Sequence, residues 1–258
     1  MNILITGYNG FIGKNMVSAL RDEHQLHFYE WGDIKPCVKG LDWVIHLGAI
    51  SSTTETDVER VMKQNLDFSI WLYDQCRAYD VNLQWSSSAS VYGPDNTTFF
   101  EEDPPDPRSP YAWSKYLFER HLRNHPCDDI IVQGFRYFNV YGSHEDHKGS
   151  QASPYHKFSQ QAKTRGKITL FEGSENYRRD FVSVDYVIDI HKIFLNISES
   201  GIWNVGTGVA TSFLDVAKTF EVPIEYVPMP ELIAKHYQRY TCASTTKLCN
   251  TLKYSCPQ

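Results

Sequence analysis

The sequence predicts an α/β fold in which helices cover both faces of a doubly wound parallel sheet. Short apolar runs alternate with segments of helical period along the first half of the chain, and this alternation is typical of βαβ units. The chain has 258 residues, which is enough to bury a full core without disulfide or metal staples. We therefore expect one large α/β domain with a smaller lobe woven into it.

Five apolar runs are the expected strands of the sheet. A parallel strand is covered on both faces, so it reads as a nearly continuous apolar run and not as an alternating one. Helical patterns separate most of these runs, as the crossover connections between parallel strands require. The strands are predicted at residues 2–6, 26–30, 43–47, 82–87 and 130–136.

The pattern becomes less regular after Tyr141. A helix is expected over residues 157–166, and short strands follow in the segments ITLFEG, DFVSV, IWNVG and IEYVP. A smaller substrate-facing lobe would be built here. We predict a first domain over residues 1–142 and a lobe over 143–258, from which residues about 180–210 return to the first domain.

Charge and cysteine content exclude several classes of protein. A net charge of −6 argues against a general binder of nucleic acids or membrane surfaces. The six cysteines form no CxxC pair and no cluster of zinc-site spacing, so we expect buried or free thiols and no metal site. The chain starts directly with a strand-like run and holds no apolar stretch of ~20 residues, so we expect a cytoplasmic protein.

A glycine-rich turn follows the first predicted strand. Gly7, Gly10 and Gly13 are spaced G-x-x-G-x-x-G and lead into a helical pattern. Glycines there allow a tight turn and a close approach of the backbone to a pyrophosphate, which the helix N-terminus attracts. The alternative is an ordinary βα turn, but the position after a strand and before a helix favours a Rossmann-like dinucleotide-binding domain.

Glu30 is the acidic residue expected about 20 residues after this turn. A carboxylate at the end of the second strand would accept hydrogen bonds from a ribose 2′-hydroxyl and repel a 2′-phosphate. Lys35 and Lys39 lie close enough in the sequence to complicate this interpretation, and Glu30 could instead be a solvated strand end.

The segment SPYAWSKY places a tyrosine and a lysine one helical turn apart. Ser109 can cap the helix and Pro110 can occupy its first position, so that Tyr111 and Lys115 lie on one face. An adjacent ammonium and a cationic nicotinamide favour the phenolate, which can take a proton from an alcohol. Ser88, at the carboxyl end of the fourth predicted strand, could hydrogen-bond the same substrate oxygen.

In this ordered set of glycine loop, serine strand and YxxxK helix the chain resembles the extended short-chain dehydrogenase/reductase superfamily. A closer resemblance, to the ADP-L-glycero-D-manno-heptose 6-epimerases, is spread over nearly the whole chain. It is carried by the segments GAISSTTETD (48–57), FRYFNVYGSHEDHKGSQAS (135–153), FEGSENYRRDFV (171–182), WNVGTG (203–208) and HYQRYT (236–241). The resemblance implies inversion of C6 in ADP-D-glycero-D-manno-heptose through a transient ketone.

An epimerase of this kind needs proton transfer at two places. Hydride leaves one face of the carbon and returns to the other, so the ketone must turn over and its oxygen moves. The resemblance assigns the second acid/base to the lysine of HKGS, which is Lys148. If the motif HKGS stood alone, its lysine would be interpreted as a solvated loop residue.

The resemblance also implies contact residues, carried over by matching motif. Cofactor contacts are expected from Gly7, Gly10, Phe11, Ile12, Gly13, Glu30, Leu47, Gly48, Ala49, Ser51, Asn65 (after a helix expected at SSTTE), Tyr111, Lys115 and Val140. Substrate contacts are expected from Ser88, Asn139, Ser150, Phe171, Glu172, Gly173, Ser174, Arg179 and Tyr237, and also from Lys157, which departs from the motif because it stands where the family has a histidine. Arg179 suits a diphosphate as a bidentate partner, although a surface ion pair with Asp180 or Glu175 is its alternative.

The resemblance implies NADP as the cofactor, whereas Glu30 makes NAD plausible, and it implies a homo-oligomer that binds a nucleotide-diphosphate sugar. One rival function is that of a UDP-hexose 4-epimerase or a 4,6-dehydratase. Dehydratases of this type need an acidic pair where this chain has Ala89 and Ser90, and a 4-epimerase leaves HKGS without a role. A non-catalytic NAD(P)-binding sensor is the rival from another class, but the chain keeps both Tyr111 and Lys115.

Overall fold

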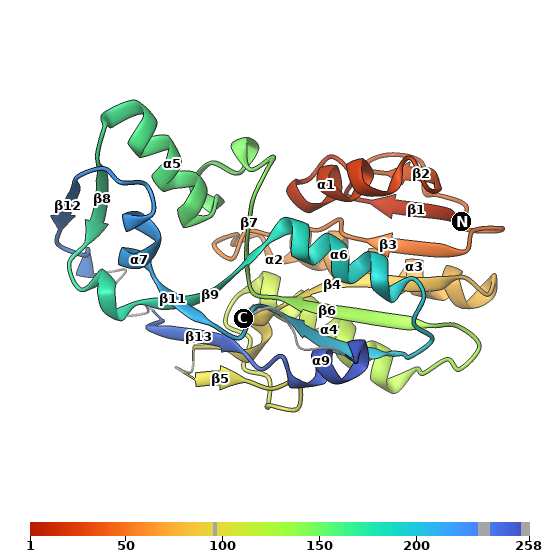
Figure 1. The fold of residues 1–258 in the computed structure, drawn as a ribbon. Coiled ribbons are helices and arrows are strands. Elements are labelled where there is room, and N and C mark those ends of the chain that lie inside the picture. The colour runs from red at the N-terminus through yellow and green to blue at the C-terminus, as the bar shows by residue number, and fades with distance from the viewer. Residues whose placement is uncertain (95–96, 232–237, 254–258) are drawn as a thin grey trace. The chain divides into compact units, whose positions relative to one another are not determined.

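The computed structural model describes residues 1–94, 97–231 and 238–253, which divide into two compact units (Figure 1). The first unit comprises residues 1–93, 104–137 and 185–203, and the second comprises residues 94–103, 138–184 and 204–258. Each unit is described here by itself. The assignment of dinucleotide and substrate binding to separate parts of the chain remains a prediction.

A six-stranded sheet with strand order β10-β6-β4-β3-β1-β2 forms the centre of the first unit. Neighbouring strands from β2 to β6 are parallel, with Ile3 opposite both Leu26 and Trp43. Its elements are β1 (Asn2–Thr6), α1 (Phe11–Leu20), β2 (Gln25–Tyr29), β3 (Trp43–His46), α2 (Val58–Val61), the π-helical stretch η1 (Met62–Asp67), α3 (Phe68–Ala78), β4 (Asn82–Ser88), η2 (Ala89–Tyr92), α4 (Pro110–Asn124), β6 (Val132–Tyr137), α6 (Val184–Phe194) and β10 (Gly201–Val205). The expected doubly wound α/β fold is confirmed.

Helices cover both faces of this sheet (Figure 1), and its inner strands β1 and β3 are buried almost throughout. On one face, Leu72 of α3 and Phe118 of α4 pack against Leu83 and Trp85 of β4. On the other face, the ring of Phe194 in α6 lies against the side chains of β6 and β10. Burial on both sides explains the continuous apolar runs from which the strands were predicted.

The second unit is built on a five-stranded sheet and a two-stranded one. The larger sheet has the path β11-β9-β13-β5 with β7 also paired to β9, and the smaller one pairs β12 with β8. The elements are β5 (Thr97–Phe99), β7 (Asn139–Tyr141), η3 (Asp146–Gln151), α5 (Pro154–Arg165), β8 (Ile168–Phe171), η4 (Ser174–Asn176), β9 (Arg178–Ser183), β11 (Ala210–Ser212), α7 (Phe213–Lys218), β12 (Ile224–Val227), β13 (Tyr240–Ala243) and α9 (Thr246–Leu252). Helix α5 begins earlier than expected because Ser153 caps it and Pro154 occupies its first position.

Cysteine chemistry differs in part from the expectation. Cys37, Cys76, Cys127 and Cys242 are free thiols, whereas Cys249 is disulfide-bonded. No spacing in the sequence indicates such a pairing, because disulfides depend on tertiary distances. None of the helices in the described ranges has the length and apolar character needed to cross a bilayer.

Candidate active site

The first part of the site lies where the strand order of the first unit reverses. Strand β2 lies on one side of β1 and β3 on the other. Ligands of such sheets bind outside the carboxyl ends of the strands at this reversal. Gly7 follows β1 and Gly48 follows β3, so the predicted cofactor loop is at the expected edge.

The glycines of this loop are required by close contacts of the backbone. A Cβ atom on Gly7 would lie 2.5 Å from Cα of Gly48, and Gly7 has a φ of +72°. A Cβ atom on Gly13 would lie 2.1 Å from the carbonyl oxygen of Gly7. Gly10 caps α1 without a side chain, which leaves the approach to the helix N-terminus open to an anion.

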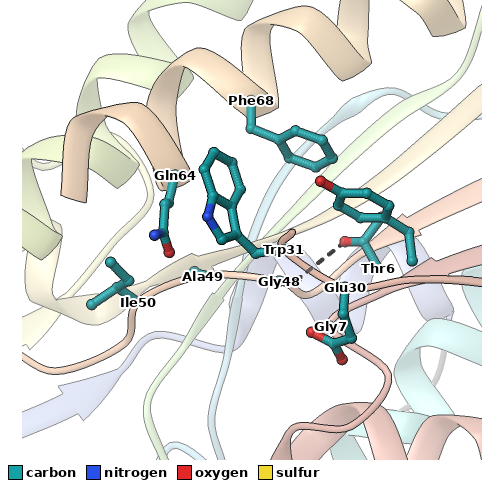
Figure 2. A pocket seen from close by; sticks show the side chains of 10 residues that line it. Thr6, Gly7, Glu30, Trp31, Gly48, Ala49, Ile50, Gln64 and Phe68 are labelled. Atoms are coloured by element: carbon teal, nitrogen blue, oxygen red, sulfur yellow. Dashed lines mark hydrogen bonds between the residues drawn. The ribbon is translucent and has the colours of Figure 1, made fainter. Parts of the chain in front are cut away.

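A pocket beside this loop carries the acidic residue (Figure 2). Glu30 accepts a hydrogen bond from the backbone N–H of Asn9 at 2.7 Å, so its carboxylate is held beside the glycine loop. Figure 2 shows the indole ring of Trp31 between the side chains of Gln64 and Phe68. The lining residues are Thr6, Gly7, Tyr29, Glu30, Trp31, Gly48, Ala49, Ile50, Gln64 and Phe68.

These residues fit the ribose and pyrophosphate of a dinucleotide. The glycine turn provides the backbone cradle, and the carboxylate of Glu30 can accept from a ribose hydroxyl. Lys35, one of the two cations near Glu30 in the sequence, has its ammonium 4.3 Å from the ring centroid of Trp71. Lys35 is therefore engaged with an aromatic ring.

A buried hydrogen-bond chain joins the ends of β1 and β3 to the following helices. The hydroxyl of Thr6 lies 2.6 Å from Nδ1 of His46, and Nε2 of His46 lies 2.8 Å from the hydroxyl of Ser69. Because Ser69 donates to the carbonyl of Asn65, its oxygen accepts from Nε2–H, and Nδ1 accepts from Thr6. Burial, assisted by the charge of Lys115, lowers the pKa of His46 to about 3, so the ring is neutral.

Asn65 connects the loop after β3 with helix α4. Its amide oxygen accepts from Ile50 N–H at 2.8 Å, and its amide nitrogen donates to Ile50 O at 3.0 Å and to Ser114 Oγ at 3.1 Å. The hydroxyl of Ser114 donates to the carbonyl of Tyr111 at 2.7 Å. Asn65 thus fixes both the loop after β3 and the start of α4.

The prediction of a helix at SSTTE is wrong. Residues 51–57 are irregular, and α2 begins at Val58, where the carboxylate of Asp57 accepts from Arg60 N–H at 3.0 Å. Asn65 lies in the π-helical stretch η1, a type of local irregularity that is frequent at functional sites. The tertiary hydrogen bonds of Asn65 accompany this irregularity, and the sequence pattern does not show them.

The structure brings Ser88, Tyr111 and Lys115 together within the first unit. Ser109 caps α4 by accepting from Ala112 N–H, which places Tyr111 and Lys115 one turn apart as predicted. The ammonium of Lys115 lies 5.8 Å from the ring centroid of Tyr111 and donates to the carbonyl of Ser86 at 2.7 Å. The side chain of Ser88 lies close enough to the phenol of Tyr111 to lower the pKa of that phenol.

Burial changes the acidity of Tyr111 and of Lys115. It raises the pKa of Tyr111, an effect that the side chain of Ser88 opposes. It lowers the pKa of Lys115 to about 7, against the opposing charge of Glu119. A lysine with this pKa can change its charge near neutral pH, which is useful beside a proton-transferring phenol.

Behind Lys115 lies a buried ion pair that the sequence did not indicate. Glu119 receives two hydrogen bonds from the guanidinium of Arg136, at 2.9 and 2.6 Å, and a third from Ser87 Oγ at 2.6 Å. Glu119 is fully buried and follows Lys115 by one helical turn. The segment FRYFN contains Arg136, but only the sheet register shows that it faces α4.

Lys148 lies in the second unit, in the 3₁₀ segment η3. Its ammonium is 3.8 Å from the buried carboxylate of Glu145, which also accepts from Gly142 N–H, Ser153 N–H and Ser153 Oγ. Burial lowers the pKa of Lys148, Glu145 opposes the shift, and Lys157 adds to it. The loop therefore has a defined conformation around one anion and two cations.

The other predicted substrate contacts of the second unit lie on several elements. Phe171 ends β8, Glu172 follows it, Gly173 adopts a left-handed conformation, and Ser174 is buried at the start of η4. Asn139 and Val140 lie on β7, the exposed Ser150 lies in η3, and Lys157 lies on α5. Tyr237 lies outside the described residues.

Arg179 is placed on β9 with its guanidinium 5.6 Å from the ring centroid of Phe213. It donates to the carbonyls of Arg178 and Gln238. Its sequence neighbour Asp180 accepts from Thr207 N–H, Gly208 N–H and Ala243 N–H, so that carboxylate holds backbone loops.

The remaining cofactor positions of the first unit lie near the same sheet edge. Phe11 and Ile12 begin α1, Leu47 N–H donates to Thr6 O at 3.2 Å, Ala49 lines the pocket, and Ser51 is exposed. Among the residues described, no group of three or more His, Cys, Asp or Glu side chains is arranged to hold a metal ion.

Comparison with known proteins decides the family. Residues 25–206 match the model of the NAD dependent epimerase/dehydratase family. The chain belongs to this family. It is 35% identical over 289 residues to an ADP-L-glycero-D-manno-heptose-6-epimerase of Brachyspira hyodysenteriae, an alignment that covers 95% of this chain and 90% of the relative.

Solved structures show the same fold. An ADP-L-glycero-D-manno-heptose-6-epimerase of Helicobacter pylori superposes with a TM-score of 0.87 at 24% identity, over 100% of this chain and 91% of that one. A UDP-glucose 4-epimerase of Thermus thermophilus in complex with NAD has a TM-score of 0.80 at 27% identity, over 99% and 94% of the two chains. The expected resemblance and the expectation of an epimerase-type enzyme are confirmed, and the roles of individual site residues stay predictions.

Proposed function

We propose that this epimerase inverts C6 of the heptose in ADP-D-glycero-D-manno-heptose to give ADP-L-glycero-D-manno-heptose. The convergence of Ser88, Tyr111 and Lys115 carries the chemical part of the proposal, because it provides a proton path at an alcohol. The relative that is 35% identical over 95% of this chain supports the choice of substrate.

Tyr111 is the first acid/base in this proposal. Its phenolate takes the proton of the sugar hydroxyl while the carbinol carbon loses hydride, and the phenol returns a proton when a ketone is reduced. Ser88, whose side chain lowers the pKa of Tyr111, is assigned to hydrogen-bond the same substrate oxygen. The ammonium of Lys115, 5.8 Å from the ring centroid of Tyr111, is assigned to stabilise the phenolate by its charge.

Inversion then requires the ketone to present its other face. Its oxygen leaves Tyr111 when the sugar turns, so a second proton donor is needed at another position. We assign this role to Lys148, whose ammonium is held by Glu145. Arg179 is assigned to the diphosphate, for which a guanidinium offers two parallel N–H donors.

A nicotinamide dinucleotide, when bound, supplies the hydride acceptor and donor. The turn at Gly7 and Gly10 would hold its pyrophosphate, and Glu30 would hold its adenosine ribose. Because Glu30 disfavours a 2′-phosphate and Lys35 is engaged with Trp71, we propose that NAD is accepted beside the NADP that the resemblance implies. Mass spectrometry of cofactor extracted from native protein tests this, and exclusive NADP would contradict it.

In the direct experiment, purified holoenzyme is incubated with ADP-D-glycero-D-manno-heptose, and the configuration at C6 is followed by NMR. UDP-galactose is the comparison substrate, since a UDP-glucose 4-epimerase shares the fold. Inversion of the heptose without turnover of UDP-galactose is expected, and the reverse preference would replace the proposal by a hexose 4-epimerase. We further propose a cytoplasmic homo-oligomer, which light scattering and cell fractionation would test.

A further inference from the structure

One carboxylate is buried in an otherwise exposed loop of the second unit. The loop joins the end of β7 to the start of α5, and from residue 142 to 151 every residue except Glu145 is exposed or half-buried. Glu145 is 1% exposed. A buried charge has a large desolvation cost, and an apolar side chain would anchor the same loop without it. The carboxylate must therefore contribute something that an apolar side chain cannot.

The hydrogen bonds of this carboxylate close the loop at both ends. Oε1 accepts from Gly142 N–H at 3.0 Å, directly after β7, and from the hydroxyl of Ser153 at 2.7 Å. Oε2 accepts from Ser153 N–H at 2.6 Å, and the same serine caps α5 by accepting from His156 N–H. Glu145 thus joins the end of β7 to the start of α5.

Lys148 lies inside this closed loop. Its backbone N–H donates to the carbonyl of Glu145 at 2.9 Å, and its ammonium lies 3.8 Å from Oε2 of the same residue. One residue therefore determines both the path of the backbone at Lys148 and the place of its ammonium. Because Gly142 and Ser153 hold the carboxylate, the anion beside Lys148 has a fixed position.

We infer that Glu145 is a positioning residue, which closes the loop between Gly142 and Ser153 and holds the ammonium of Lys148 beside a fixed anion. An apolar anchor would also close the loop, but it would leave the ammonium without this counter-charge. The inference rests on the proposed role of Lys148 as the second acid/base. The arrangement itself stands on the distances, and it can be tested without turnover.

The charges around Lys148 give the expected effect a sign. Burial lowers the pKa of Lys148, Glu145 opposes this shift, and Lys157 on α5 adds to it. Removing the charge of Glu145 should therefore lower the pKa of Lys148 further and favour the neutral amine. The other titratable side chains of the loop and of the first turn of α5 are His144, Asp146, His147, Tyr155 and His156.

The first test measures the pKa of Lys148 in the holoenzyme by competitive labelling. Acetic anhydride acetylates only the neutral amine, so labelling over a pH series, read by peptide mass spectrometry, has its midpoint at the pKa of each lysine. The exposed Lys163 on α5 is the internal reference for the labelling rate. We expect the midpoint of Lys148 to lie at lower pH in Glu145→Gln than in the parent. A midpoint that Glu145→Gln leaves unmoved would overturn the inference.

Two control variants separate the charge of Glu145 from packing. Asp146→Asn removes one negative charge at the next position, where the side chain is 84% exposed and lies 3.9 Å from His156. Ser153→Ala removes one hydrogen bond to Glu145 but keeps the anion. Both should leave the midpoint of Lys148 near that of the parent. A shift in either control as large as that in Glu145→Gln would assign the effect to general charge or to packing and overturn the inference.

The second test links the positioned ammonium to turnover. A proton donor must be protonated, so the decline of kcat at high pH should move to lower pH in Glu145→Gln. At pH 8 we expect kcat to fall by at least about tenfold, part of the ~10²–10⁴-fold that a general acid contributes, with KM nearly unchanged. In dismutation of an aldehyde analogue of the sugar, Glu145→Gln should cause no further loss in the Lys148→Met background. An equal loss with and without Lys148 would make Glu145 a packing residue and overturn the inference.

Two further outcomes are decided by the labelling. If Glu145→Gln does not fold, Glu145→Asp takes its place, because it keeps the charge but withdraws it by one methylene. The midpoint of Lys148 should then still fall below that of the parent, and an unchanged midpoint would overturn the inference. Absence of heptose turnover in the parent enzyme would refute the proposed function, and the labelling midpoints would then decide the role of Glu145 by themselves.

Discussion

Two buried neutral histidines make the first unit sensitive to acid. His46 and His191 are both fully enclosed, and burial lowers the pKa of each from 6.5 to about 3. In the unfolded chain each ring returns to its ordinary pKa, so at pH 5 the unfolded state binds protons that the folded state does not. Protonation therefore favours unfolding, and the stability is present above pH 6.5 and is lost as the pH falls toward 3.

The size of the effect follows from the two pKa values. Between pH 7 and pH 5, a group with a pKa of 6.5 unfolded and about 3 folded reduces the free energy of unfolding by about 2 kcal/mol. The two histidines together give about 4 kcal/mol. Lys115, with a folded pKa of about 7, adds only about 0.4 kcal/mol in this interval because both states are protonated over most of it.

Urea unfolding at pH 7 and pH 5, followed by the fluorescence of the buried Trp85 and Trp203, measures this difference. His46→Gln should reduce the loss between the two pH values to about 2 kcal/mol, because one titrating ring remains. The comparison is made within each variant, so its absolute stability does not enter. A loss that is the same in the parent and in His46→Gln would refute the assignment of His46 as a buried neutral ring.

Three further predictions concern the catalytic groups and their support. Tyr111→Phe should bind cofactor as the parent does but lose about 10²–10⁴-fold in epimerisation rate, and unchanged turnover would remove Tyr111 from the mechanism. Lys148→Met should abolish inversion while sparing part of the Tyr111-centred reaction in a dismutation assay with an aldehyde analogue of the sugar; a higher KM with unchanged kcat would make Lys148 an anion contact. Glu119→Gln should cost about 3–5 kcal/mol in urea unfolding because it leaves Arg136 buried without its partner. Arg108→Ala, at an exposed pair with Asp106, is the matched control and should cost about 1 kcal/mol or less.

Local sequence signals predicted much of the first unit. The strand at residues 2–6 was predicted with its observed limits, since its three central residues are apolar and buried. Ser109 and Pro110 predicted the start of α4, because capping depends on residues adjacent in sequence. The convergence of Ser88, Tyr111 and Lys115 followed from these two kinds of signal.

Contacts between distant residues could not be predicted in the same way. Glu119 pairs with Arg136, and Tyr137 with His191, only because the register of the sheet and the crossing of the helices place them together. The π-helical stretch around Asn65 is accompanied by hydrogen bonds to Ile50 and Ser114, which no local pattern indicates. Buried polar networks are thus the part of this site that the structure adds.

The central claim is that hydride leaves and returns to the same carbon while its configuration inverts. Substrate labelled with deuterium at C6 of the heptose, incubated with holoenzyme and analysed by NMR and mass spectrometry, tests it most directly. The account predicts ADP-L-glycero-D-manno-heptose that retains the label at C6, with no net change in the absorbance of the bound nicotinamide over many turnovers. Loss of the label to solvent, or reduced cofactor accumulating in proportion to substrate, would contradict it.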